Sequence, residues 1–187
     1  MTKPKLRKKY KALRSELTTN TIDNLSIDIA NNVLKLPIWD FSNYHMFLTI
    51  DELKEVNTDF IINVLAGKDK HIVISKTILK NLKMINYLLT DSTVIKKSNF
   101  NIPEPLDGIE VPHNKIEVAF IPLLAYDRQG NRVGYGKGIY DVFLSTCNPE
   151  IVKVGLSFFE PEEAIDDILE SDIPLNYCVT PKEIFKF

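Results

Sequence analysis

Apolar residues recur with helical spacing near the start of the chain and gather into short continuous runs further along it. The first stripe repeats at intervals of three or four residues and comprises Leu6, Tyr10, Leu13 and Leu17. This spacing predicts an amphipathic helix, which Thr2 would cap and which would carry Pro4 in its first turn. A second stripe predicts a helix over residues 21–36, which Pro37 ends.

Short apolar runs alternate with helical patterns from residue 44 onward. The predicted strands cover residues 44–50, 71–75, 83–89, 93–96, 118–125, 151–158 and 177–179. The predicted helices between them cover residues 58–65, 140–147 and 161–169. Residues 101–105 contain two prolines, so we expect no regular element there.

This alternation predicts an α/β fold, and the near-continuous apolar strands indicate a sheet that is buried on both faces. We expect a single three-layer domain over residues 1–187, with a mainly parallel, Rossmann-like sheet and helices on both faces. The N-terminal helices, residues 3–36, would pack on this sheet. Ligands in such folds bind beyond the C-terminal ends of the strands.

The composition argues against several classes of function but does not identify one. The 187 residues are 44% hydrophobic and carry a net charge of −2, so no cationic field attracts nucleic acid or an acidic membrane. Two cysteines and three histidines form no zinc pattern, and no apolar run is long enough to span a bilayer. No signal peptide is recognisable, and we expect a monomeric protein of the cytoplasm.

A glycine-rich loop follows the apolar run at residues 118–125. Four of the seven glycines fall between residues 130 and 138. A glycine loop between a buried strand and a helix directs backbone N–H groups at one spot, which suits a phosphate. The loop fits neither the P-loop nor the dinucleotide fingerprint, so by itself it is weak evidence of a phosphate site.

Charged residues near this loop strengthen the phosphate interpretation. Arg132 and Lys137 flank the glycines and would pair with phosphate oxygens. Asp141, at the start of the next helix, either caps that helix or holds a Mg²⁺ that bridges phosphates. On the first helix, Lys3, Arg7 and Arg14 project within an arc of roughly 40°. They form either a solvated cationic face or a group that reaches an anionic ligand.

The loop and the strand before it resemble a known family signature. Residues 121–127 read IPLLAYD and residues 130–141 read GNRVGYGKGIYD. This long, ungapped match resembles the signature of the 5-formyltetrahydrofolate cyclo-ligases, which are also called methenyltetrahydrofolate synthetases. Residues 3–7, 55–58 and 172–180 resemble further family segments, so the likeness extends along nearly the whole chain.

The resemblance implies an ATP-dependent enzyme. Its reaction would convert 5-formyltetrahydrofolate to 5,10-methenyltetrahydrofolate and release ADP and phosphate, with Mg²⁺ required. Phosphorylation of the formyl oxygen would turn a poor leaving group into a good one, and N10 of the folate would then attack the activated carbon. The partners implied are these small molecules, with no nucleic acid and no membrane.

The resemblance also implies roles for individual residues. Lys137 and Arg132 would be catalytic, and Asp141 and Asp172 would hold Mg²⁺. The residues implied in ATP binding are Lys3, Arg7, Arg132, Val133, Gly134, Tyr135, Gly136, Lys137, Gly138, Ile139 and Tyr140. The residues implied in folate binding are Glu55, Thr49, Tyr135, Gly136, Lys137, Gly138 and Ile139.

The chain departs from the family pattern at several positions. Ile139 stands where the family usually has Tyr, and Tyr135 where some members have Arg. Ser171 and Asn176 replace a histidine and an aspartate in the tail segment. Glu52 is the alternative to Glu55 as the folate contact.

These departures keep a second hypothesis open, namely a catalytically weakened nucleotide- or folate-binding protein of the same fold. A third, an RNA-binding module that uses the cationic first helix, is disfavoured by the pI of about 5.9.

Overall fold

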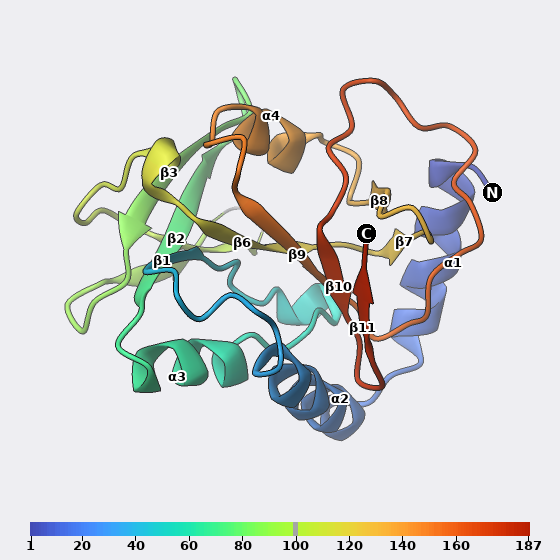
Figure 1. Cartoon of the computed structure of the whole chain (residues 1–187), viewed down its shortest axis with the longest axis horizontal. Helices are drawn as coiled ribbons and strands as arrows, with labels where there is room; N and C mark the ends of the chain where they lie inside the picture. Colours follow the sequence, from blue (N-terminus) through green and yellow to red (C-terminus); the bar gives the residue numbers. More distant parts are fainter. Residues whose placement is uncertain (99–100) are drawn as a thin grey trace.

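A seven-stranded sheet runs through the middle of the computed structural model, which describes residues 1–98 and 101–187 (Figure 1). From one edge to the other, its strands are β11 (Ile184–Lys186), β10 (Tyr177–Val179), β9 (Val152–Leu156), β6 (Val118–Pro122), β1 (Asn43–His45), β2 (His71–Ile78) and β3 (Lys83–Leu88). The five strands from β10 to β2 are parallel. The edge strands β11 and β3 are antiparallel to their neighbours, so the prediction of a mainly parallel sheet is confirmed.

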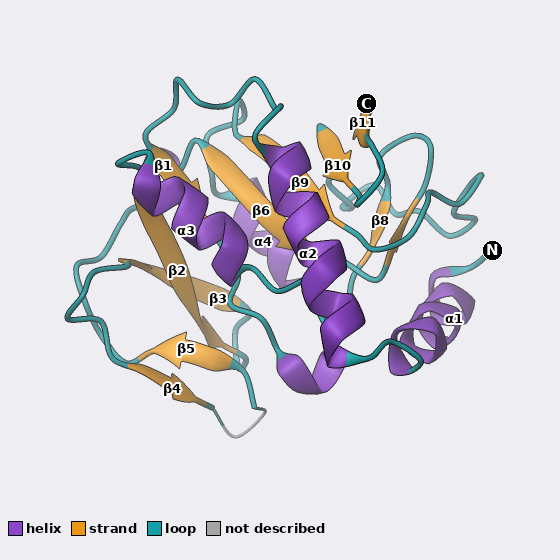
Figure 2. Cartoon of the chain, turned by 90° about the horizontal axis from the view of Figure 1, so that it is seen from below, coloured by secondary structure: helices purple, strands orange, loops and turns teal. Residues whose placement is uncertain are grey.

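Helices cover both faces of this sheet. Helices α2 (Thr19–Val33) and α3 (Asp59–Gly67) lie on one face and α4 (Ile139–Ser145) lies on the other (Figures 1 and 2). Helix α1 (Lys3–Ser15) contacts a small two-stranded sheet formed by β7 (Ala125–Tyr126) and β8 (Arg132–Val133). The three-layer α/β class is therefore confirmed, while the extent of a single domain over residues 1–187 stays a prediction.

The central strand β6 shows why the apolar run is continuous. Val118 and Phe120 belong to the core cluster that includes Ile29 of α2. Ala119 and Ile121 belong to a second cluster on the other face, with Phe143 of α4. Because successive side chains on a strand point to opposite faces, a strand between two helical layers has to be apolar at every position.

Residues 103–105 contradict the sequence prediction. We expected no regular element at the two prolines, yet β5 (Pro103–Pro105) pairs with β4 (Ile95–Lys97). The flanking residues make the interstrand bonds: the carbonyl of Ile102 accepts from Ser98 and the N–H of Leu106 donates to Val94. The prolines occupy the alternate positions, where an N–H would point away from the partner strand, so the missing donors cost nothing.

The helix predicted over residues 161–169 is also wrong. The backbone of this segment bonds to other parts of the chain: Glu162 donates its N–H to the carbonyl of Tyr126, and Ile165 donates to the carboxylate of Asp127. Asp166 donates to the carbonyl of Met1. In a helix, the N–H groups of Ile165 and Asp166 would bond to the preceding turn, so these tertiary partners replace helical hydrogen bonds.

Other differences are smaller. The predicted strand at residues 44–50 has regular pairing only in β1, and the helix predicted over residues 21–36 is α2. Strand β11 was not predicted. In α1, Leu13 is 40% exposed, and the basic residue Arg14 takes the buried position beside Tyr10. Two short 3₁₀ helices, η1 (Asp51–Leu53) and η2 (His113–Lys115), complete the elements. Within the described residues, no helix is long and apolar enough to cross a membrane.

Candidate active site

A cavity of about 1040 Å³ opens beyond the C-terminal ends of β1 and β6, which is the edge where a parallel sheet carries its ligand. His45 at the end of β1 and Pro122 at the end of β6 line it. The glycine loop at residues 134–138, the start of α1, and residues 167 and 169–173 complete one side. The structure therefore brings together segments that are more than 120 residues apart in sequence.

Two glycines give the loop its path. Gly136 and Gly138 adopt positive φ angles of 98° and 67°, which side-chain-bearing residues rarely adopt. A Cβ on Gly136 would also lie 3.3 Å from the guanidinium carbon of Arg7. Arg7 donates from Nε to the carbonyl of Gly134 at 2.9 Å, so α1 anchors the loop directly.

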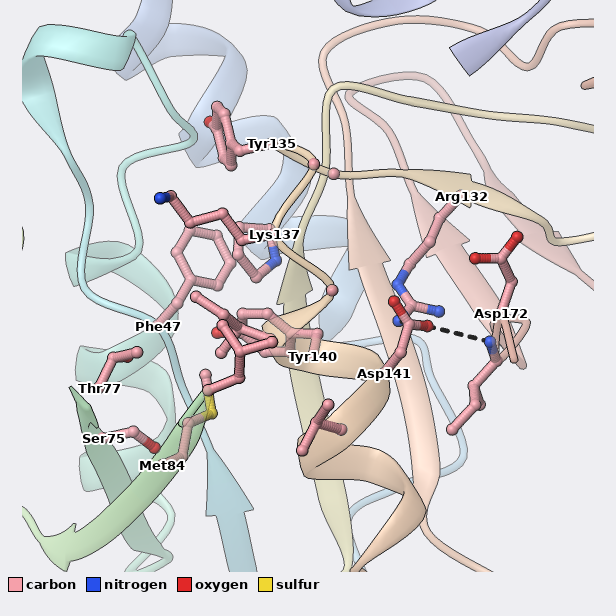
Figure 3. A pocket seen from close by; sticks show the side chains of 18 of the residues that line it. Phe47, Ser75, Thr77, Met84, Arg132, Tyr135, Lys137, Tyr140, Asp141 and Asp172 are labelled. Carbon is pink, nitrogen blue, oxygen red and sulfur yellow. Dashed lines mark hydrogen bonds and ion pairs between the residues drawn. The ribbon is translucent and has the colours of Figure 1, made fainter. Parts of the chain in front are cut away.

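One end of the cavity is charged. Arg132 donates to Asp141 Oδ1 at 2.7 Å, and the same oxygen accepts the N–H of Ile173 at 3.1 Å (Figure 3). Lys3 forms an ion pair with Asp172. The side chains of Arg132 and Lys3 are only 6% and 11% exposed. This end thus holds two cation–carboxylate pairs in a mostly buried setting.

Two features of these pairs bear on ligand binding. Burial tends to raise the pKa of Asp172, but the N–H of Leu169 and the Lys3 ammonium outweigh it, so the pKa lies below its ordinary value and the carboxylate stays ionised. The second amino nitrogen of Arg132, Nη1, is buried without a hydrogen-bond partner. A buried guanidinium donor left unpaired is available to an anionic ligand.

Lys137 lies between the charged end and the rest of the cavity. Its side chain is exposed and lines the cavity, and among the described residues it forms no ion pair. Its ammonium points toward Phe47 and away from Arg132 and Asp141 (Figure 3). Lys137 is therefore a free cation within the cavity.

Glu55 is a buried carboxylate in the cavity wall, 2% exposed. The hydroxyl of Tyr135 donates to its Oε1 at 2.6 Å, and the N–H of Ile50 donates to its Oε2 at 2.9 Å. Burial raises the pKa of Glu55, and these two hydrogen bonds partly oppose the rise. The rival residue Glu52 pairs with Lys97 at 2.9 Å with both side chains well exposed, and it does not line the cavity.

The other end of the cavity is apolar. Its lining side chains come from the segments after β1 and around the β2–β3 turn, and from β5. They are Met46, Phe47, Leu48, Leu79, Leu82, Met84, Ile102 and Pro103. A wall of this kind suits a flat, largely apolar ligand such as a fused ring system.

A short polar chain lies at the floor of this apolar end. His45 Nε2 lies 2.8 Å from the hydroxyl of Ser75, which donates to Asn86 at 2.6 Å. His45 is 1% exposed, and burial lowers its pKa to about 3, so it is neutral. Ser75 and Thr77 alternate along β2 and both line the cavity.

Most of the site residues predicted from the sequence meet at this cavity. Lys3, Arg7, Glu55, Asp141, Asp172 and residues 132 and 134–140 all line it. Val133 does not, because it is buried beneath α1 with Leu6 and Tyr10. Thr49 does not either, since its hydroxyl donates to the carbonyl of Val56 and accepts from the N–H of Thr58.

Sequence reasoning missed the apolar wall and two charged residues that line the cavity, Asp167 and Glu170. Asp167 lines the cavity and accepts the backbone N–H of Lys3 at 2.6 Å. Arg14 donates to the hydroxyl of Tyr135 at 2.8 Å and to the carbonyl of Leu123 at 2.6 Å. The sequence groups Arg14 with Lys3 and Arg7 as candidates to reach an anionic ligand, but unlike those two Arg14 does not line the cavity. The apolar residues gave no local signal that distinguishes them from core residues.

Comparison with known proteins finds the same family that the sequence of the glycine loop resembles. The model of the 5-formyltetrahydrofolate cyclo-ligase family matches residues 1–181. A probable 5-formyltetrahydrofolate cyclo-ligase of Schizosaccharomyces pombe is 27% identical over 187 residues, which covers 91% of each protein. The cyclo-ligase of Haemophilus influenzae is 32% identical over 110 residues, 56% of this chain, and this shorter alignment spans 58% of that protein.

A solved structure supports the same relationship. The NMR structure of Aquifex aeolicus 5,10-methenyltetrahydrofolate synthetase superposes with a TM-score of 0.84 at 26% identity. The match covers 100% of this chain and 93% of that one.

Proposed function

The chain belongs to the 5-formyltetrahydrofolate cyclo-ligase family, and from this we propose that it converts 5-formyltetrahydrofolate to 5,10-methenyltetrahydrofolate with ATP and Mg²⁺, releasing ADP and phosphate. The observation that carries the proposal is the shape of its cavity. A charged end and an apolar end open into one space, and the glycine loop with Lys137 lies between them. A polyanion and a ring system can therefore meet at Lys137.

ATP would bind at the charged end. Lys3, Arg7 and Arg132 supply cations there, and the backbone of residues 134–138 lines the same space. The unpaired Nη1 of Arg132 is a donor that a phosphate oxygen would satisfy. Binding would exchange the Lys3–Asp172 and Arg132–Asp141 pairs, because the two cations would turn to phosphate and release the two carboxylates.

Asp141 and Asp172 fit a Mg²⁺ site. They are oxygen donors that line one cavity, and Asp141 bonds to the N–H of Ile173, the residue after Asp172. The described residues contain no cluster of three or more potential ligands. Mg²⁺ suits such a site because it commonly takes one or two carboxylates and completes its shell with phosphates and water. When bound, the ion would neutralise phosphate charge.

The chemistry follows from what lies between the two ends. The formyl oxygen of the folate attacks the γ-phosphorus, ADP leaves, and an iminium phosphate remains at N5. N10 then attacks the activated carbon and gives up its proton to solvent, and phosphate departs as the ring closes. Lys137 and Arg132 would stabilise the charge that develops on the transferred phosphoryl group, which is the main task in such a transfer.

The folate would lie at the apolar end. Glu55 offers acceptor oxygens to the N–H groups of the pterin edge. Phe47, Met84 and their neighbours would cover its ring faces. Gly136 and Gly138 let the loop approach the ring because they carry no side chain.

The proposal is tested by mixing purified protein with ATP, Mg²⁺ and 5-formyltetrahydrofolate and following the absorbance of methenyltetrahydrofolate. We expect turnover that requires both ATP and Mg²⁺. No signal at high enzyme concentration would reject the activity. Calorimetric binding of folate without ATP consumption would then favour the weakened binding protein, which the departures at Ile139 and Ser171 suggest. Sedimentation velocity tests the proposed monomer, and localisation in cells tests the proposed cytoplasmic setting.

A further inference from the structure

Three side chains form a continuous hydrogen-bonded chain across the cavity wall. Arg14 of α1 donates from Nη1 to the hydroxyl oxygen of Tyr135 at 2.8 Å, and Tyr135 donates its own proton to Glu55 Oε1 at 2.6 Å. Arg14 is 4% exposed and Glu55 is 2% exposed. The chain thus links a buried cation to a buried carboxylate through a tyrosine of the glycine loop.

We infer that Arg14, acting through the Tyr135 hydroxyl, stabilises the ionised form of the Glu55 carboxylate and orients it toward the folate. Arg14 and Tyr135 are then positioning residues for Glu55. This inference rests on the proposed function, in which Glu55 accepts hydrogen bonds from the folate.

The surroundings of Glu55 explain why it needs such support. Burial favours the neutral acid, and Asp51 of η1 adds a like charge. Tyr140 of α4 also lies within electrostatic range of Glu55 and contributes no positive charge. Two influences favour the carboxylate besides the N–H of Ile50: the Tyr135 hydrogen bond and the positive charge of Arg14. A protonated Glu55 would lose an acceptor, and the folate N–H groups would be left unpaired.

Arg14 is itself fixed in this role. Its Nη2 donates to the carbonyl of Leu123 at 2.6 Å. Leu123 directly follows β6, so this bond holds the guanidinium group at the end of the central strand. The carbonyl of Leu123 and the hydroxyl of Tyr135 are both neutral acceptors. Because Arg14 forms no ion pair among the described residues, its charge is not cancelled locally and acts along the chain.

The test is an NMR titration of the full-length protein with ¹³C-labelled glutamate carboxyl groups, in which the Glu55→Gln variant identifies the Glu55 signal. We expect Tyr135→Phe to move the Glu55 midpoint up by about one pH unit, because a hydrogen bond to a charged group is lost. Arg14→Gln should move it in the same direction, which keeps the test decisive if Tyr135→Phe folds poorly. Tyr10→Phe is the matched control, since Tyr10 is also buried and donates to a glutamate, Glu162, at 2.7 Å, away from the cavity.

Calorimetric titration of 5-formyltetrahydrofolate without ATP provides the functional readout. Affinity should fall as pH decreases through the Glu55 midpoint, and in Tyr135→Phe this fall should begin about one pH unit higher. Equal midpoints in Tyr135→Phe and Tyr10→Phe would overturn the inference. The proposed activity can fail independently of this inference. If the variants move the titration midpoint of Glu55 but the wild-type protein shows no turnover, the activity is rejected and the electrostatic role of Arg14 stands.

Discussion

The two ends of the cavity are built in different ways. At the charged end, two of the cations pair with carboxylates: Lys3 with Asp172 of a distant segment, and Arg132 with Asp141, nine residues further along the chain. At the apolar end, side chains such as Phe47 and Met84 line the wall and form no such pairs. Under the proposed function, ATP at the charged end would exchange these ion pairs, whereas the folate at the apolar end would pack against the wall. The first end would therefore select its ligand by charge and the second by shape.

Lys137 lies between the two ends, and its replacement should have the largest effect on turnover. Because the proposed function has Lys137 act on charge that develops in the transition state, Lys137→Ala should lower kcat by about 100- to 1000-fold and change the KM for ATP much less. Steady-state kinetics with varied ATP measures both. Lys115→Ala, which changes an exposed lysine of η2 outside the cavity, is the control. An unchanged kcat would remove Lys137 from the chemistry and place the reaction at one end alone.

The stability of the charged end should depend on its buried cation–carboxylate pairs. Asp141→Asn leaves the guanidinium of Arg132, 6% exposed, without its counter-charge, and should lower the free energy of unfolding by about 2 kcal/mol. Urea denaturation measures this change. Asp166→Asn breaks the exposed pair with the N-terminus and should cost less than about 1 kcal/mol. Equal losses in the two variants would show that burial of the Arg132 pair does not matter.

His45, at the floor of the apolar end, is a buried titratable residue whose effect on stability depends on pH. Burial lowers the pKa of His45 to about 3, while the unfolded chain takes up the proton near its ordinary value of 6.5. The unfolded state therefore binds more protons below pH 6.5, and stability falls as pH decreases from about 6.5 toward 3.

The part of the unfolding free energy that depends on His45 should fall by about 1.4 kcal/mol for each pH unit in this range. In His45→Gln, the pH dependence of the unfolding free energy should be shallower by that amount between about pH 6 and pH 4. His71→Gln is the control, because His71 is exposed. If both variants keep the wild-type slope, protonation of His45 does not limit acid stability.

The smallest expected effect is on folate binding at the apolar wall. Phe47→Leu removes part of the covering surface and should raise the KM for 5-formyltetrahydrofolate by about fivefold, with the KM for ATP unchanged. Phe158→Leu makes the same substitution at a core position outside the cavity. A parallel rise in both KM values for Phe47→Leu would show that the two ends do not select their ligands separately.

Local sequence patterns were sufficient to predict parts of the fold and of the site. Strand β10 falls at the residues predicted for it, and Gly136 and Gly138 take the left-handed conformations that a glycine loop needs. Such features depend on a few neighbouring residues, so the sequence determines them directly. The clustering of Lys3, Arg7 and Arg14 on one arc of α1 is likewise a local property of a helix.

Tertiary contacts decided the remaining features. The segment at residues 161–169 is not helical because Asp127 and Met1 accept the N–H groups of Ile165 and Asp166. Strand β5 forms despite its two prolines because the residues on either side of it bond to the chain around β4. The sequence by itself determined the family signature, the mainly parallel sheet and the glycine-rich loop between a buried strand and a helix. Only the folded chain decided that Arg14 reaches Glu55 through Tyr135, because these residues are up to 121 positions apart and no local pattern encodes their contact.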